Sequence, residues 1–151
     1  MHNKKKVIIE NNVFDNLAMA AVYLSNDCND WYESGAVRDM IIRGNTFYIK
    51  HTPDKKGKNK GAIYLDPIVK SFKQGAAGIH KNIVIENNKF YMEHDNILFA
   101  RGCENIVFKN NTAEKLESNE SEKVIKAFKF QNCKNISIEN NKFGSGVDSS
   151  V

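Results

Sequence analysis

Hydrophobic and polar positions alternate in one short pattern that recurs five times along the chain. Each copy has an apolar strand of period two and then an Asn-Asn or Gly-Asn pair; in four copies a phenylalanine follows two residues after the second Asn. Such a unit cannot bury its apolar face alone, whereas copies stacked on one another form a continuous core. The copies span residues 7–14, 40–47, 83–90, 106–113 and 136–143.

The spacing of the copies favours a β-solenoid over a helical repeat. The second Asn of one copy is separated from that of the next by 33, 43, 23 and 30 residues, while the strand itself keeps its length. We predict a second period-two strand between the copies, at 22–24, 63–65, 97–99 and 128–130. The fold class is therefore expected to be all-β, a right-handed parallel β-helix of about five coils with long loops flanking one sheet.

Two columns of polar residues indicate how the coils are aligned. The second Asn residues would lie above one another at the inter-strand spacing of about 4.8 Å and exchange amide hydrogen bonds. Outward residues of the strands alternate in charge from copy to copy, which is mildly favourable between neighbouring strands. The two columns are Asn12, Asn45, Asn88, Asn111 and Asn141, and Glu10, Arg43, Glu86, Lys109 and Glu139.

Length and composition indicate one domain. The 151 residues, 41% of them hydrophobic, suit a single domain at 1–143 that we expect to be a partial solenoid, and residues 144–151 are expected to form a flexible tail. The net charge is +4, and we interpret the lysine-rich stretch at 55–60 as a solvated loop. We therefore expect neither nucleic acid nor a membrane as a partner.

The first strand follows Met1 closely, without a signal peptide or a segment that caps the first coil. We interpret this as either a fragment of a longer protein or an end buried by self-association. A stripe of apolar residues on the outer face of the first strands offers a second surface for a homo-oligomer, although scattered β-branched residues on strands are also ordinary. The stripe consists of Ile8, Ile41, Val84 and Val107.

The cysteines are weak evidence for a metal. Cys103 and Cys133 occupy equivalent places before their copies, and His80 holds that place one copy earlier. Parallel side chains are poorly aimed for a disulfide, so we expect two free buried thiols. A zinc site would need a fourth ligand that the sequence does not offer, and we predict neither a metal nor another cofactor.

Long insertions place candidate chemistry at one edge of the second-strand sheet. Residues 25–39 and 66–82 are expected to wall a groove whose floor carries Tyr23, Tyr64, Leu98 and Lys129. Aromatic rings suit a sugar, and paired carboxylates perform glycoside hydrolysis, but acidic residues also form turns. The candidate catalytic residues are Asp27, Asp30, Glu33 and Asp66, and the candidate substrate-binding residues are Trp31, Tyr32, Tyr23, Tyr64 and Arg101.

The first insertion also carries a resemblance to a known family. Residues 26–39, which include Asp30-Trp-Tyr-Glu33, followed by residues 40–47, resemble a segment of the glycoside hydrolase family 110 α-1,3-galactosidases. Those bacterial β-helix enzymes remove terminal α-1,3-linked galactose with inversion. The resemblance covers most of this chain but only the C-terminal portion of such an enzyme. It implies that some catalytic carboxylates, an adjacent Asp pair among them, lie in earlier coils.

Residues and resemblance together predict a carbohydrate-active β-helix domain that is galactosidase-like and truncated, with activity on its own left open. The resemblance implies a galactose-containing glycan as partner and an extracytoplasmic location, periplasmic or secreted. Trp31, Tyr23 and Tyr64 would stack on sugar, and Arg101 would orient it. The alternative is a non-catalytic β-helix module that binds a glycan or a protein.

Overall fold

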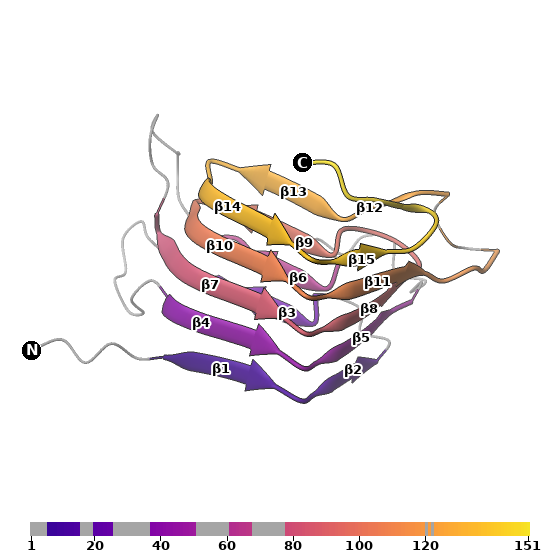
Figure 1. The fold of residues 1–151 in the computed structure, drawn as a ribbon, viewed down its shortest axis with the longest axis horizontal. Helices are drawn as coiled ribbons and strands as arrows, with labels where there is room; N and C mark the ends of the chain where they lie inside the picture. The colour runs from indigo at the N-terminus through magenta and orange to yellow at the C-terminus, as the bar shows by residue number, and fades with distance from the viewer. Residues whose placement is uncertain are drawn as a thin grey trace, which may run out of the picture.

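The protein is a stack of parallel β-strands, as Figure 1 shows. The computed structural model describes residues 6–15, 20–25, 37–50, 61–67, 78–119, 121 and 123–151. These ranges contain sixteen strands and no helix, so none of the described segments is a helix that could cross a membrane. All strand pairs are parallel, and the predicted parallel β-helix is confirmed.

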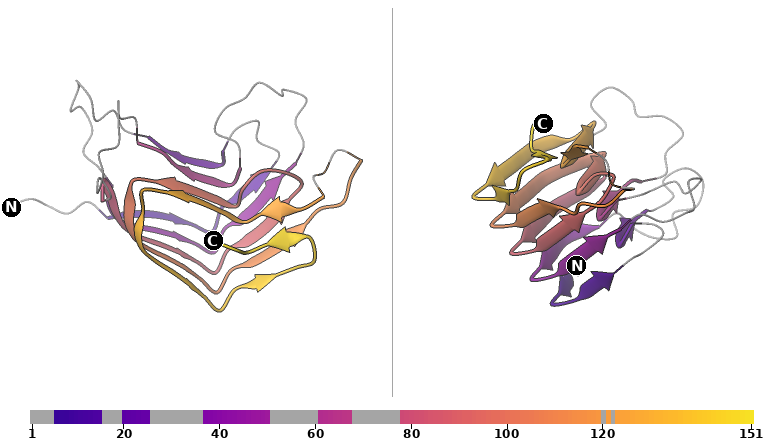
Figure 2. Two further views of the ribbon diagram at one scale, coloured as in Figure 1. Left: turned by 90° about the horizontal axis from the view of Figure 1, so that it is seen from above. Right: turned by 90° about the vertical axis from the view of Figure 1, so that its right-hand side faces the viewer.

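Three sheets run along the stack, and successive coils lie over one another in both views of Figure 2. The first sheet has the order β1 (Val7–Glu10), β4 (Arg38–Arg43), β7 (His80–Glu86), β10 (Cys103–Lys109) and β14 (Lys134–Glu139). The second has β2 (Val13–Asp15), β5 (Thr46–Ile49), β8 (Lys89–Met92), β11 (Thr112–Lys115) and β15 (Lys142–Phe143). The third has β3 (Val22–Leu24), β6 (Ile63–Leu65), β9 (Leu98–Arg101) and β13 (Phe128–Gln131).

The turn between the first and second sheets explains why each copy contains an Asn-Asn or Gly-Asn pair. Its first residue has a positive φ, a conformation that Gly and Asn adopt with the least strain. The φ values are 57° for Asn11, 65° for Gly44, 55° for Asn87, 54° for Asn110 and 53° for Asn140. The chain therefore turns sharply there, and the second Asn of each pair enters the corner of the solenoid.

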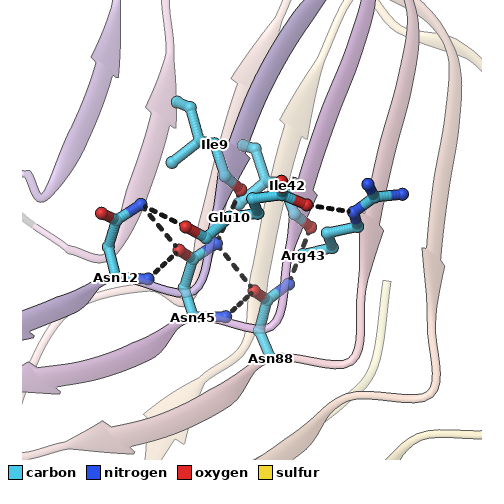
Figure 3. Close-up of polar contacts among 7 residues, drawn as sticks. All are labelled: Ile9, Glu10, Asn12, Ile42, Arg43, Asn45 and Asn88. Carbon is cyan, nitrogen blue, oxygen red and sulfur yellow. Dashed lines mark hydrogen bonds and ion pairs between the residues drawn. The ribbon is translucent and has the colours of Figure 1, made fainter.

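The second asparagines form a continuous hydrogen-bonded ladder, part of which Figure 3 shows. Each side-chain amide donates to Oδ1 of the next asparagine, and that same oxygen also accepts the backbone N–H of the donor residue. The amide-to-amide distances are 3.2 Å for Asn12 to Asn45, 3.1 Å for Asn45 to Asn88, 3.1 Å for Asn88 to Asn111 and 3.2 Å for Asn111 to Asn141. The buried polar corner is thus satisfied by its own neighbours.

The charged column follows the register expected from the sequence. Glu10, Arg43, Glu86, Lys109 and Glu139 are successive Cα partners across the first sheet. Arg43 Nε lies 2.7 Å from Glu10 Oε2, and Lys109 Nζ lies 3.6 Å from Glu86 Oε2. Because exposed ion pairs contribute only about 0–1 kcal/mol, these pairs mark the register rather than hold the fold.

Stacked aromatic rings fill the core behind the second sheet. Phe14, Phe47 and Phe90 follow one another with ring centroids 5.0 and 4.8 Å apart and nearly parallel planes. Phe108, from the first sheet, lies 5.9 Å from the ring of Phe90. Phe47, Phe90 and Phe108 are among the largest fully buried side chains, so this column supplies much of the hydrophobic stabilisation.

The third sheet departs from the predicted register at one place. Ile97 and Leu98 are both fully buried, and their N–H groups donate to the same carbonyl, that of Ala127, at 3.0 and 2.9 Å. This β-bulge shifts the alternation of inward-facing and outward-facing side chains by one residue. The prediction that Leu98 faces outward is therefore wrong, and Phe99 takes the outward place opposite Tyr64.

The C-terminal segment, expected to be a flexible tail, contains a strand. β16 (Val147–Asp148) pairs in parallel with β12 (Ile125–Lys126). The N–H groups of Ile125 and Ala127 donate to Gly146 and Asp148 carbonyls at 2.8 Å each. These donors belong to a segment about twenty residues earlier in the chain, so composition alone does not indicate the pairing.

Candidate functional site

The outer face of the third sheet carries a column of aromatic residues. Tyr23, Tyr64 and Phe99 are successive Cα partners, and Lys129 follows them. The rings of Tyr64 and Phe99 are stacked, with centroids 4.2 Å apart and planes 8° apart. Tyr23 is tilted by 57° to Tyr64 at 5.9 Å, and Lys129 Nζ lies 5.9 Å from the Phe99 centroid. The expected Tyr23–Tyr64 pair is present, and Phe99 extends it.

The stacking decides which ring can receive a flat apolar ligand face. Phe99 covers one face of Tyr64, and Tyr23 is tilted against its other side. Tyr23 belongs to β3, the end strand of this sheet, and is 43% exposed. An apolar ring face therefore has more room to pack on Tyr23 than on Tyr64.

A polar column lies beside the aromatic one, two residues further along the strands. Asp66 follows β6, and Arg101 and Gln131 end β9 and β13, where they are Cα partners. Arg101 Nε donates to Asp66 Oδ1 at 2.7 Å, and Arg101 Nη2 lies 2.5 Å from the same oxygen. Among the described residues, both contacts use Oδ1, so the other carboxylate oxygen of Asp66 can accept a hydrogen bond from a ligand.

The phenol of Tyr64 lies within the influence of this ion pair. Burial and the negative charge of Asp66 raise the pKa of Tyr64 above its ordinary value of 10; Tyr23 adds to the rise and Arg101 opposes it. The phenol is therefore protonated at neutral pH and able to donate. The face thus combines a hydroxyl donor, a carboxylate acceptor and a guanidinium, groups that fix the orientation of a polar ligand.

Four of the nine predicted site residues come together on this face: Asp66, Tyr23, Tyr64 and Arg101. The remaining five lie outside the described residues, as do most of the predicted groove walls at 25–39 and 66–82. Those five are Asp27, Asp30, Trp31, Tyr32 and Glu33. On the outer face of the third sheet, the described residues supply one carboxylate, whereas glycoside hydrolysis uses two.

Two features of the site were not predicted from the sequence. Phe99 belongs to the aromatic column only because of the bulge before it, and the run Ile97-Leu-Phe99 has no polar residue that would reveal the phase. A hollow of about 490 Å³ lies next to the column and shares Lys129 with it. Its described lining is Asp95, Asn96, Val124, Lys126, Phe128 and Lys129. In the sequence, the feature that points to this hollow is the presence of two lysines three residues apart, Lys126 and Lys129.

His80, Cys103 and Cys133 do not form a metal site. His80 is the Cα partner of Cys103, as the sequence predicts, but His80 Nδ1 accepts the backbone N–H of Val37 at 3.2 Å. Within the described ranges, no group of three or more His, Cys, Asp or Glu residues is placed to hold a metal ion. Cys103 and Cys133 are free thiols; Cys103 is buried and Cys133 is half-buried.

Comparison with known proteins relates the chain to a group of glycosidases. No family model matches it. It is 38% identical over 112 residues to alpha-1,3-galactosidase A of Peterkaempfera griseoplana, 36% over 140 residues to alpha-1,3-galactosidase B of Akkermansia muciniphila, and 35% over 143 residues to alpha-1,3-galactosidase B of Bacteroides thetaiotaomicron. These alignments cover 74%, 91% and 94% of this chain but 14%, 17% and 23% of the relatives. The chain therefore spans less than a quarter of their length.

Proposed function

We propose a function for this chain on the premise that, over the segment it spans, it belongs to the family of the α-1,3-galactosidases. The proposed function is to bind a terminal α-1,3-linked galactose on the outer face of the third sheet, as part of an inverting galactosidase. The sequence relationship over most of the chain carries this proposal. The gathering of Tyr23, Tyr64, Asp66 and Arg101 on one face supports the location.

Each of these residues has a proposed role that follows from its surroundings. Tyr23 packs on the apolar face of the sugar, because its ring is the most open of the column. Tyr64 donates its phenol hydrogen to a sugar oxygen, since its raised pKa keeps it protonated. Asp66 accepts a sugar hydroxyl through its second carboxylate oxygen, while Arg101 holds that carboxylate in place.

Hydrolysis is the finer part of the proposal. Inversion needs an acid and a base whose carboxyl groups stand about 6.5–9.5 Å apart, so that a water fits between one of them and the sugar. Asp66 is the candidate on the described face, and Asp27, Asp30 and Glu33 are the further candidates in this chain. Turnover by the chain alone requires one of these as partner to Asp66; otherwise the second carboxyl group comes from outside it.

The test separates binding from turnover. The purified chain is mixed with an α-1,3-galactosyl disaccharide; binding is followed by saturation-transfer NMR and galactose release by chromatography. We expect binding that is lost in Asp66→Asn and in Tyr23→Ala. Asp15→Asn is the matched control, because Asp15 is an exposed carboxylate of the second sheet that pairs with Lys50 at 3.2 Å.

The possible results decide between the parts of the proposal. Galactose release that is lost in Asp66→Asn supports catalysis by this chain. Binding without release supports a glycan-binding segment of an enzyme whose remaining carboxylates lie elsewhere. Disaccharide binding of equal strength in wild type, Asp66→Asn and Tyr23→Ala contradicts the location, and no binding at all contradicts the function.

A second candidate function is self-assembly through the outer face of the first sheet. Ile8, Ile41, Val84 and Val107 are successive Cα partners there, and Ile8 is 44% exposed. A hollow of about 380 Å³ adjoins this stripe, lined in the described part by Lys6, Asp39, Met40, Ile41, Asn82 and Val84. The occupant we propose is a second copy of the chain. Light scattering that finds only monomers over a wide concentration range excludes it, and a dimer dissociated by Ile41→Lys supports it.

A further inference from the structure

Two thiols lie side by side between the last two coils. Cys103 begins β10, and Cys133 directly precedes β14. The next residues, Glu104 and Lys134, are Cα partners, so the cysteines occupy matching places on neighbouring strands. Strands stand about 4.8 Å apart, which falls within the range of Cα separations that a disulfide spans, so a bridge requires the two parallel side chains to rotate toward each other while the strands stay in place. Neither cysteine is oxidised, and each thiol affects the pKa of the other.

The pair is asymmetric in its exposure to solvent. Cys103 has no exposed surface, whereas Cys133 is half-buried and therefore reachable by a small reagent. Cys103 Sγ donates to the carbonyl of Arg101 at 3.5 Å. Cys133 Sγ lies 3.3 Å from the carbonyl of Ala100 and 3.4 Å from that of Gln131. Both sulfurs thus contact the backbone that carries the polar column of the third sheet.

The two thiols also differ in acidity. The Cys103 thiol beside it lowers the pKa of Cys133 to about 7, so that a large fraction of Cys133 is thiolate at neutral pH. The Cys133 thiol, together with burial, raises the pKa of Cys103. Because the thiolate is the nucleophilic form, Cys133 is the reactive member and Cys103 is held protonated beside it.

We propose that Cys133 is a modification site, a peroxide-reactive thiol that Cys103 resolves into a disulfide between neighbouring coils. In the first step the Cys133 thiolate attacks one oxygen of hydrogen peroxide. A sulfur–oxygen bond forms, the peroxide bond breaks, and hydroxide leaves and takes a proton to become water. Cys133 is then a sulfenic acid, oxidised by two electrons, and the peroxide is reduced.

Oxidation of Cys133 prepares Cys103 for the second step. The sulfenic acid is neutral, so the negative charge of the Cys133 thiolate, which raises the pKa of Cys103, is removed. Cys103 then loses its proton to water and attacks the Cys133 sulfur. The disulfide forms, the sulfur–oxygen bond breaks, and hydroxide leaves as water. In total, two thiols and one peroxide give one disulfide and two waters.

The disulfide would act on the backbone next to the candidate site. It ties β10 to β14 and removes the S–H group that donates to the Arg101 carbonyl, two residues before Cys103. A cross-link also restricts the unfolded chain, so the midpoint of thermal unfolding should rise unless strain opposes it. The proposal does not depend on the galactosidase function, since it concerns the thiols alone.

The test follows the fate of both thiols. The chain, carrying Cys28→Ser so that only two thiols remain, is treated with one equivalent of hydrogen peroxide, alkylated and analysed by intact mass and peptide mapping. We expect the loss of both free thiols together, and a cross-linked peptide containing Cys103 and Cys133 in the monomer. Before oxidation, Cys133 should alkylate at least about tenfold faster than Cys103 at neutral pH.

Single variants identify the order of the steps. Cys103→Ser should leave a sulfenic acid at Cys133, trapped by dimedone, without an internal disulfide. Cys133→Ser should abolish the reaction with peroxide. Because either variant could fail to fold, the wild-type peptide map is decisive by itself: peroxide-treated wild type with Cys103 and Cys133 unlinked, or equal alkylation rates of the two thiols, overturns the proposal.

Discussion

Asn88 donates its side-chain amide to Oδ1 of Asn111 over 3.1 Å, although the two residues are 23 positions apart in the chain. The amide of Asn88 also donates to the carbonyl of Ile42, and its Oδ1 accepts from Asn45. Asn88 is 1% exposed. The ladder therefore ties three successive coils through one buried residue, and its loss leaves partners on both sides unpaired.

Asn88→Ala should lower the free energy of unfolding by about 2–4 kcal/mol, because it removes several buried hydrogen bonds and leaves a cavity. Urea denaturation measures this. Asn12→Ala is the control: Asn12 ends the ladder and is exposed, so its loss should cost about 1 kcal/mol or less. Equal effects at the two positions would contradict the importance of burial.

His80 should make the protein less stable in acid. It is fully buried, and burial together with the charge of Arg38 lowers its pKa from 6.5 to about 4. The unfolded chain therefore binds a proton at higher pH than the folded one, so stability is full above about pH 6.5 and falls as the pH drops toward 4. The difference between the two pKa values corresponds to a loss of about 3 kcal/mol.

The measurement is the unfolding free energy of wild type and His80→Gln at about pH 7 and about pH 4.5. Other groups titrate in both proteins, so the difference between their pH slopes isolates His80. A variant with an unchanged slope would show that His80 is not the acid-sensitive group.

Gly61→Ala should destabilise the start of β6. Gly61 has a φ of 123°, and a Cβ there would lie 2.5 Å from the backbone carbonyl oxygen of Asn96, an atom that cannot rotate away. We expect a loss of about 2 kcal/mol or more in urea denaturation. Gly44→Asn is the contrast. Its φ of 65° is the one that asparagine adopts in the other coils, and the nearest atom is a side-chain oxygen of Asn11, so the effect should be smaller.

The effects of Arg101 and Asp66 on the free energy of unfolding should be coupled, because the two side chains form an ion pair. Its side chains are 32% and 18% exposed, so each single change, Arg101→Met or Asp66→Asn, removes a partly buried contact from the side chain that remains. We expect each to cost about 1–2 kcal/mol and the double variant to cost less than their sum. A double-mutant cycle measures the difference. Strict additivity would mean that the contact contributes nothing in solution.

The parts of the fold that repeat could be predicted from the sequence. Asn45, Asn88 and Asn111 stand at one place in each copy, so stacking the copies stacks these residues, and the hydrogen bonds follow. The charged column follows for the same reason. A second polar ladder was missed, although an Asp or Asn directly before four of the five apolar strands signalled it. Asn82 donates to Asp39 at 2.9 Å, Asn105 to Asn82 at 3.0 Å and Asn135 to Asn105 at 3.1 Å.

The site was less predictable, because its residues depend on distant hydrogen bonds. The sequence placed Tyr23 beside Tyr64 correctly, since both lie in short alternating strands. It placed Leu98 on the outer face of the third sheet, because residues 97–99 are all apolar and no polar residue shows which of them faces outward. The backbone N–H groups of Ile97 and Leu98 both donate to the carbonyl of Ala127, which lies in the following coil. These hydrogen bonds determine that Phe99, not Leu98, faces outward.

By itself, the sequence determined that this protein is a parallel β-helix, because a period of two and a recurring Asn corner specify both the strand and the way copies stack. Only the tertiary structure decided that Phe99 faces outward and that Arg101 reaches Asp66. The physical reason is that alternation fixes which side of a strand a residue occupies only where polar residues interrupt it. Bulges and ion pairs of this kind arise between coils, where the register is set by hydrogen bonds from elsewhere in the chain.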